Sequence, residues 1–302
     1  MLLRERELAI ELRILQALKG RLLFSPEMER QLWNSESGQM GDRAFDCIGA
    51  EYENDLVRMN DLVLSADGKL CQVDALYICD GVLYLFEVKN WTGAFRLNNG
   101  EFLGGSACPL AQLNRSRKIL ERVLWNLRIS VPVEMRLVFM GPGVCLYGLR
   151  QEDPILMAHQ LPKFFEGLRR QNRRFIQRSD IQLGERLVQC HVADNPYRKL
   201  PPYSSKTVAS GIMCPNCRVA MRPYHAKNLI CGDCGFNELK KNSLRRSITE
   251  LDLLFPLEKQ RVHQIYQWCD GLVSKDSSIN SLVVKNLHNL TNKRQSCADI
   301  PG

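Results

Sequence analysis

The chain reads Gln72-Val73-Asp74 and, after one turn, Leu83-Tyr84-Leu85-Phe86-Glu87-Val88-Lys89, so charged groups stand inside apolar, strand-like runs. An ionised side chain in such a run is costly unless it is paired or binds a metal ion. Because side chains alternate along a strand, Glu87 and Lys89 lie on the same side and Val88 points away. Two acids beside a lysine suit a hard divalent cation and phosphodiester chemistry.

Short β-rich runs surround these charges, at Leu62–Leu64, Cys71–Ile78 and Val82–Val88. They are separated by Asp-Gly turns at 66–69 and 79–81, and this arrangement predicts an antiparallel meander. The run Val82–Val88 is apolar on both faces, which is expected of a central strand that is covered on each side.

Helical periodicity flanks the meander. We expect helices over residues 4–18, from Gly41 onward, and over 109–128 and 161–175, with further strands at 135–140 and, beside it, 144–147. Asp42 would be an N-cap or first-turn acid of the second helix, and residues 93–105 a glycine-rich loop. This pattern predicts an α/β fold with a mixed sheet flanked by helices.

Composition favours a globular protein in the cytoplasm. The chain has 302 residues, of which 45% are hydrophobic and 25% charged. It contains no apolar run near the ~20 residues of a membrane helix, and Met1–Glu7 alternates charge where a leader would be apolar. The net charge is +8, and from Lys206 onward 14 Lys and Arg face 8 Asp and Glu, which points to a polyanionic partner and to no membrane.

Four of the twelve cysteines form two Cys-x-x-Cys pairs, Cys214 with Cys217 and Cys231 with Cys234, separated by thirteen residues. This spacing lets four thiolates surround a zinc ion at ~2.3 Å and leaves no open position, so the zinc would be structural. It would supply folding energy to a segment too short for its own core. The alternatives are a chance cluster or a redox motif, although redox pairs occur singly beside a βαβ unit. The other eight cysteines indicate buried free thiols.

The motifs Gly41-Asp42, Asn60-Asp61, Gln72-Val73-Asp74 and Phe86-Glu87-Val88-Lys89-Asn90, followed by Gly93, resemble the nuclease-related domain, NERD, over residues 38–135. That family is regarded as a divergent branch of the PD-(D/E)XK nuclease-like superfamily. The resemblance implies a restriction-endonuclease-like core that holds Mg²⁺ or Mn²⁺. It assigns metal binding to Asp74 and Glu87, action on the attacking water or phosphate to Lys89, and assisting roles to Asp42 and Gln112.

Asp42 departs from the family pattern, which more often has Gly-Glu where this chain has Gly41-Asp42. The shorter acid favours a water-bridged metal contact over a direct one. Each residue also has a structural alternative. Asp74 suits a turn cap, Glu87 an ion pair with Lys89, Asp42 a helix cap, and Gln112 a surface position on its helix.

The chain divides into four expected parts. Residues 1–37 are an N-terminal helix and lead-in, 38–205 the nuclease-related core, 206–240 the zinc ribbon, and 241–302 a small helical module with a disordered tail. The module, with short helices on either side of Pro256, suits a helix-turn-helix reader, or equally a bundle for packing or dimerisation.

The predicted function is a metal-dependent nuclease that the zinc ribbon and basic last third hold on a nucleic acid, with DNA favoured over RNA. The alternative is a non-catalytic nucleic-acid-binding or scaffold protein with a nuclease-derived fold. A homo-oligomer is left open. On the ribbon, Arg222, Tyr224 and Lys227, together with Arg218 and His225, would meet the nucleic acid or form a solvated face.

Overall fold

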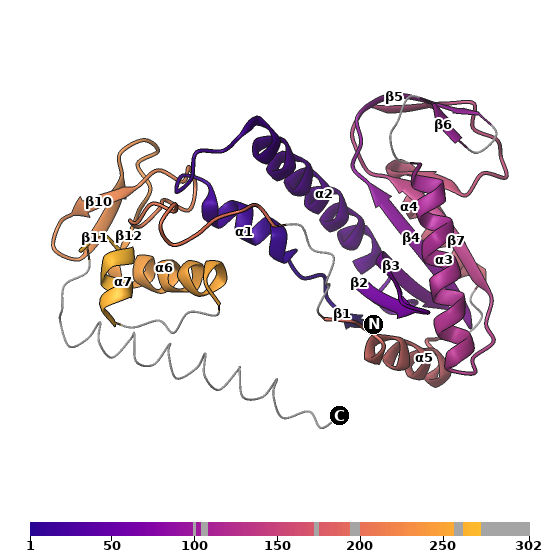
Figure 1. Cartoon of the computed structure of the whole chain (residues 1–302). Helices are drawn as coiled ribbons and strands as arrows, with labels where there is room; N and C mark the ends of the chain where they lie inside the picture. The colour runs from indigo at the N-terminus through magenta and orange to yellow at the C-terminus, as the bar shows by residue number, and fades with distance from the viewer. Residues whose placement is uncertain (99–100, 104–107, 172–174, 194–199, 257–261, 273–302) are drawn as a thin grey trace. The chain divides into compact units, whose positions relative to one another are not determined.

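The computed structural model describes the chain except residues 99–100, 104–107, 172–174, 194–199, 257–261 and 273–302 (Figure 1). The chain forms two compact units, each described by itself. The first comprises Met1–Leu8 and Trp33–Arg198, and the second Ala9–Leu32 and Lys199–Gly302. None of the helices within the described ranges has the length and apolarity needed to span a membrane.

The first unit is built on a mixed sheet with the order β1-β2-β3-β4-β7-β9. Its strands are β1 (Leu2–Arg4), β2 (Val57–Ala66), β3 (Lys69–Cys79), β4 (Val82–Lys89), β7 (Val133–Phe139) and β9 (Ile155–Met157). Strands β2, β3 and β4 pair antiparallel, whereas β1, β7 and β9 join parallel to their neighbours. The predicted meander and mixed sheet are therefore confirmed.

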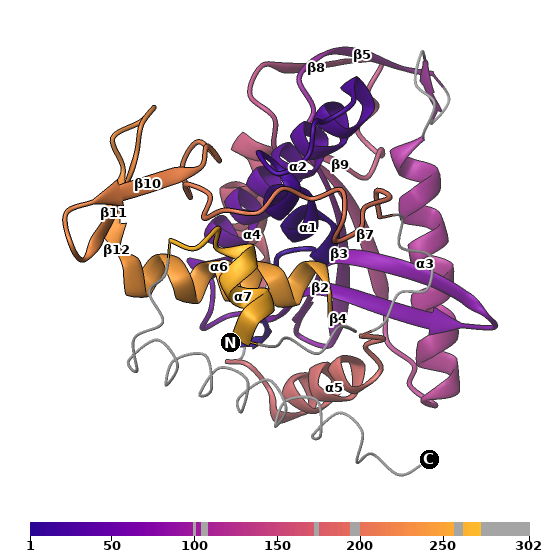
Figure 2. The same ribbon diagram turned by 60° about the vertical axis from the view of Figure 1, so that its left-hand side comes forward.

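Helices cover both faces of this sheet (Figure 2). Helices α3 (Pro109–Asn126) and α5 (Arg178–Gln189) pack on one apolar cluster, and α2 (Pro26–Ala50) and α4 (Leu161–Gln171), preceded by the 3-10 turn Ala158–Gln160, pack on the other. In β4, Leu83 and Leu85 belong to the first cluster and Tyr84 and Phe86 to the second. This explains why the sequence of β4 is apolar on both faces.

The structure differs from the prediction at the beginning of the chain. Residues 4–18 were expected to form one helix, but Leu2–Arg4 form β1 and helix α1 begins at Ile10. Edge pairing of β1 with β2 takes the first residues away from the helix. The expected lead-in is also divided, because Ala9–Leu32 pack in the second unit.

Asp42 does not cap a helix, because α2 begins at Pro26 and runs without interruption through Gly38 and Gly41. The glycines suggested a boundary, but Gly41 serves close packing. A Cβ atom there would lie 2.6 Å from the Cβ of Asn90. The Asn90 Nδ2 atom donates to the Ser37 carbonyl oxygen at 2.7 Å, which ties the end of β4 to α2.

The segment after β4 is also more ordered than a loop. Residues 93–105 contain β5 (Gly93–Asn98) and β6 (Glu101–Leu103), which pair antiparallel. Strand β8 (Val144–Tyr147), expected beside β7, pairs instead with β5, and β9 takes the position next to β7. The prediction for 144–147 was right about the strand and wrong about its partner.

The second unit contains a small antiparallel sheet of β10 (Met221–Tyr224), β11 (Asn228–Cys231) and β12 (Asn237–Leu239). It shares one apolar cluster with α1 (Ile10–Leu18), α6 (Lys240–Leu254) and α7 (Val262–Trp268). The expected helices on either side of Pro256 correspond to α6 and α7. The rest of the predicted helical module and the predicted tail, residues 273–302, lie outside the described residues.

Replacing each of the two glycines of α2 by alanine should have opposite effects on stability. In Gly41→Ala the new methyl group meets Asn90, so we expect the free energy of unfolding to fall by about 1–3 kcal/mol. Gly38 is exposed with nothing within 4 Å of a Cβ atom, so Gly38→Ala should raise it by about 0.5–1 kcal/mol. Urea denaturation of both variants measures the difference, and equal effects would contradict the close packing of Gly41.

Candidate functional site

Strands β3 and β4 separate at one end, and we call this point the fork. Their pairing extends from Cys79 and Val82 to Ala75 and Phe86, whereas β4 continues to Lys89 beside β7. At the fork, the Asp74 Oδ2 atom accepts a hydrogen bond of 2.8 Å from the Val88 backbone N–H. The carboxylate thus satisfies an amide that the β3 backbone no longer reaches, and its own position is fixed.

Glu87, Lys89 and Gln112 meet beside the fork. The Lys89 Nζ atom lies 2.6 Å from Glu87 Oε1 and donates to Gln112 Oε1 at 3.2 Å. Glu87 is 1% exposed, whereas the Lys89 side chain keeps 20% of its exposure. Strand β4 and helix α3 therefore place a carboxylate, an ammonium and an amide together, with the ammonium at the surface side.

Helix α2 brings Asp42 and Asp46, one helical turn apart, to the same region through Arg6. The Arg6 guanidinium donates to both carboxylate oxygens of Asp46, at 2.8 and 3.1 Å. Its Nη1 atom lies 3.2 Å from Asp42 Oδ2. It also donates to the Asp74 carbonyl oxygen at 2.8 Å. Arg6 and Asp46 were not among the residues predicted from the sequence. The spacing of Asp46 from Asp42 was a usable signal, but Arg6 had none, since it lies far away in sequence.

The acids raise one another's pKa values. Burial, followed by the charge of Asp74, raises the pKa of Glu87 to about 8, and the same two causes raise the pKa of Asp42 to about 7. Burial also raises the pKa of Asp74, although the Val88 N–H, Lys89 and Arg6 oppose the shift. The pKa of Arg6 is raised because its Asp46 bond and the acidic charges outweigh its burial. When ionised, the four carboxylates Asp42, Asp46, Asp74 and Glu87 outnumber the two cations that pair with them, Arg6 and Lys89.

We call Asp42, Asp46, Asp74 and Glu87 the acidic site. Its members influence one another electrostatically, but they do not form a closed set of ligands. Among the described residues, the one group of three or more potential ligands whose atoms all lie within 4.8 Å is the cysteine cluster. An open arrangement of this kind is compatible with Mg²⁺, which is usually held by one or two carboxylates and keeps several waters.

The cysteine cluster brings all four predicted thiols together. The Sγ atoms of Cys214 and Cys234 are 3.5 Å apart, and that of Cys217 lies 3.3 Å from Cys231 and 3.7 Å from Cys234. A tetrahedral zinc site with bonds of about 2.3 Å has sulfur–sulfur edges of about 3.8 Å. The cluster could therefore hold a structural metal such as zinc.

Backbone amides support these sulfur atoms. The amide of Val219 points to the Cys217 sulfur, those of Cys234 and Asp233 to Cys231, and that of Phe236 to Cys234. Such N–H donors favour thiolates over thiols and orient them toward a shared ion.

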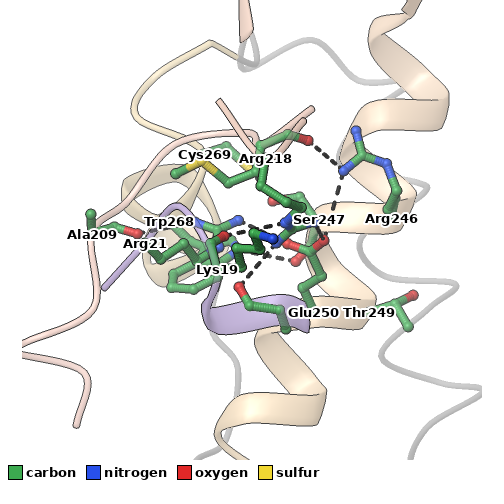
Figure 3. A network of polar contacts seen from close by, with 12 residues as sticks. Lys19, Arg21, Ala209, Arg218, Arg246, Ser247, Thr249, Glu250, Trp268 and Cys269 are labelled. Carbon is green, nitrogen blue, oxygen red and sulfur yellow. Dashed lines mark hydrogen bonds and ion pairs between the residues drawn. The ribbon is translucent and has the colours of Figure 1, made fainter. Parts of the chain in front are cut away.

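Arg21, Arg218 and Arg246 converge on Glu250 in a network of polar contacts (Figure 3). Arg218, which follows Cys217, donates to the carbonyl oxygens of Ala17 and Lys19 and to Glu250 Oε1 at 2.7 Å. Glu250 Oε2 accepts from Arg21 at 2.9 Å, and the Arg21 guanidinium lies 3.9 Å from the Trp268 ring centre. Arg218 is therefore part of the internal packing of the second unit, not a free phosphate contact.

Residues 38–140 match the family described as nuclease-related domain, NERD, which supports the resemblance inferred from the motifs over about a third of the chain. No curated protein is significantly similar to the chain. Protein VC1899 from Vibrio cholerae, a solved crystal structure, is 12% identical with a TM-score of 0.27. That match covers 50% of this chain and 37% of that protein, and a similarity so distant says nothing about function.

Without a divalent cation, the stability of the first unit should decrease as the pH rises from about 5 to about 8. Asp42 and Glu87 have native pKa values of about 7 and 8, against about 4 in the unfolded chain. The native state therefore binds more protons in this window, and each carboxyl lowers the free energy of unfolding by up to about 1.4 kcal/mol per pH unit. Urea denaturation in Mg²⁺-free buffer at several pH values measures this slope.

Glu87→Gln should flatten that slope, and Glu121→Gln, at an exposed ion pair with Arg117, should leave it as in the wild type. A slope that does not change in Glu87→Gln would contradict the assigned origin of the pH dependence.

Proposed function

We propose that the chain is a divalent-cation-dependent nuclease with a restriction-endonuclease-like core. The observation that carries the proposal is the meeting of Asp74, Glu87 and Lys89 at the fork, within the segment that matches the nuclease-related domain. Buried carboxylates with raised pKa values are typical of functional sites, and here they favour the binding of a cation. The donor set of carboxylate oxygens is the one that Mg²⁺ and Mn²⁺ prefer.

Each residue has a defined role in this proposal. Asp74 and Glu87 hold the cation, which when bound supplies Lewis acidity toward the scissile phosphate. Lys89 places its ammonium group beside Glu87, at the surface side, where it stabilises charge on the phosphate or orients the attacking water. Gln112 fixes that ammonium through its amide oxygen. Asp42, on α2, does not bind the cation directly and assists through a bridging water.

A second candidate function, a binding or scaffold protein without turnover, has its own supporting observations. Lys89 is tied to Glu87 and Gln112, and Asp42 is tied to Arg6. Contacts of this kind stabilise the folded structure whether or not the residues take part in hydrolysis. The two candidates differ in one property, cleavage, and share the expected affinity for a nucleic acid, DNA in particular.

Purified full-length protein should cleave a nucleic acid in Mg²⁺ or Mn²⁺ and not in EDTA. Single- and double-stranded DNA and RNA are each tested by gel electrophoresis. We expect Asp74→Asn and Glu87→Gln to lose at least about 100-fold in rate, while Glu121→Gln retains the wild-type rate.

Cleavage that persists in both fork variants would eliminate the proposed site. Binding of the same substrates with no cleavage under any condition would favour the scaffold function.

We further propose that the cysteine cluster and strands β10, β11 and β12 form a zinc ribbon. The tetrahedral sulfur spacing and the amides directed at the thiolates support it. The zinc closes the ends of a segment whose three strands are only three or four residues long, so binding of the ion and folding are linked.

We expect purified protein to contain one zinc ion per chain, measured by inductively coupled plasma mass spectrometry. Cys217→Ser should lose the zinc and expose the second unit to proteolysis, because a three-thiolate site is open. Cys190→Ser, at a thiol of the first unit, is the matched control and should retain it. Full zinc content in Cys217→Ser, or none in the wild type, would refute the ribbon.

A further inference from the structure

Arg6 lies outside the segment that matches the nuclease-related domain, yet it binds two members of the acidic site, Asp42 and Asp46. Its side chain is only 5% exposed, and the side chains of Asp42 and Asp46 are 22% and 19% exposed. A buried guanidinium needs partners for most of its N–H groups. Arg6 finds them in two carboxylates and one backbone oxygen.

The contacts of Arg6 are those that a cation would make on the α2 side of the fork. Its Nη1 atom lies 3.2 Å from Asp42, its Nε and Nη2 atoms bind Asp46, and its Nη2 atom binds the Asp74 carbonyl oxygen. A divalent ion placed against Asp42 would share this space with the guanidinium and repel it. The Glu87 carboxylate pairs instead with Lys89, and the Asp74 carboxylate accepts from the Val88 N–H and feels the charges of both Lys89 and Arg6.

The charges of the region give the same answer. Once all four carboxyls are ionised, as a bound cation favours, the acidic site contributes four negative charges, and Arg6 and Lys89 contribute two positive ones. The remainder of two negative charges equals the charge of one divalent ion. Asp61, the next acid, has Arg4 beside it, whose Nε atom donates to the Asp61 carbonyl oxygen at 3.1 Å. A second divalent ion would leave the site with excess positive charge.

We propose that Arg6 occupies the position of a second metal ion, so that the acidic site takes one divalent cation, between Asp74 and Glu87. This inference rests on the proposed function and specifies its metal content. Arg6 is a positioning residue, since it holds Asp42 and Asp46 on the α2 side and touches no reacting atom. Through its hydrogen bond to the Asp74 carbonyl oxygen, Arg6 also connects the first residues of the chain to the fork.

The stoichiometry of Mn²⁺ binding to the zinc-loaded full-length protein tests the inference, with calorimetry for the number of sites and electron paramagnetic resonance for paired ions. The wild type should bind one Mn²⁺, and Glu87→Gln should lose it. Asp42→Asn should still bind one ion, with its affinity lowered by about 10- to 100-fold, as expected of a residue that reaches the metal only through water. Arg6→Met, which removes the charge and keeps an unbranched side chain, should bind a second Mn²⁺ and show a spin-coupled pair.

Arg43→Met, at an exposed arginine of the same helix, is the matched control and should bind one ion like the wild type. Two ions in the wild type would overturn the inference and leave the nuclease proposal standing, and this result does not depend on the folding of any variant. No Mn²⁺ in the wild type would instead remove the metal site of the proposed function. One ion in a folded Arg6→Met would show that Arg6 does not exclude the second.

Discussion

The separation of β4 from β3 is the constraint on which the candidate site depends. Between Phe86 and Lys89 strand β4 loses one neighbour and keeps the other, so backbone groups at this point need partners other than a strand. The Asp74 carboxylate supplies one of them. Burying that carboxylate next to Glu87 concentrates negative charge where the sheet opens, and the raised pKa values measure the resulting cost.

Packing of α2 against the end of β4 sets the other side of the site. Gly41 allows the helix to approach Asn90 closely, and this approach presents Asp42 and Asp46 toward Arg6 and the fork. The second unit depends on a different interaction, the convergence of Arg21 and Arg218 on Glu250, which joins the first cysteine pair to α1 and α6. Each unit therefore places buried charge beside its candidate functional residues.

The sequence was informative wherever a local pattern decided the structure. Alternation and Asp-Gly turns predicted the meander, and Asp67, Gly68, Asp80 and Gly81 all adopt the positive φ that such turns require. Cysteine spacing predicted the cluster. The sequence was uninformative where contacts between distant segments decide the structure. Gly41 resembled a helix boundary because its partner, Asn90, is distant in sequence, and β8 was assigned to the wrong neighbour because its partner, β5, is distant in sequence as well. Arg6 enters the site through the parallel pairing of β1, which periodicity does not reveal.

The central claim is that the fork is built to hold a divalent cation with carboxylate oxygens. The most direct measurement is a crystal structure of the protein soaked in Mn²⁺, with anomalous scattering recorded at the manganese edge. The account predicts an anomalous peak within about 2.0–2.3 Å of oxygen atoms of Asp74 and Glu87. A fully soaked crystal with no peak at the fork, or with manganese bound only elsewhere, would contradict it.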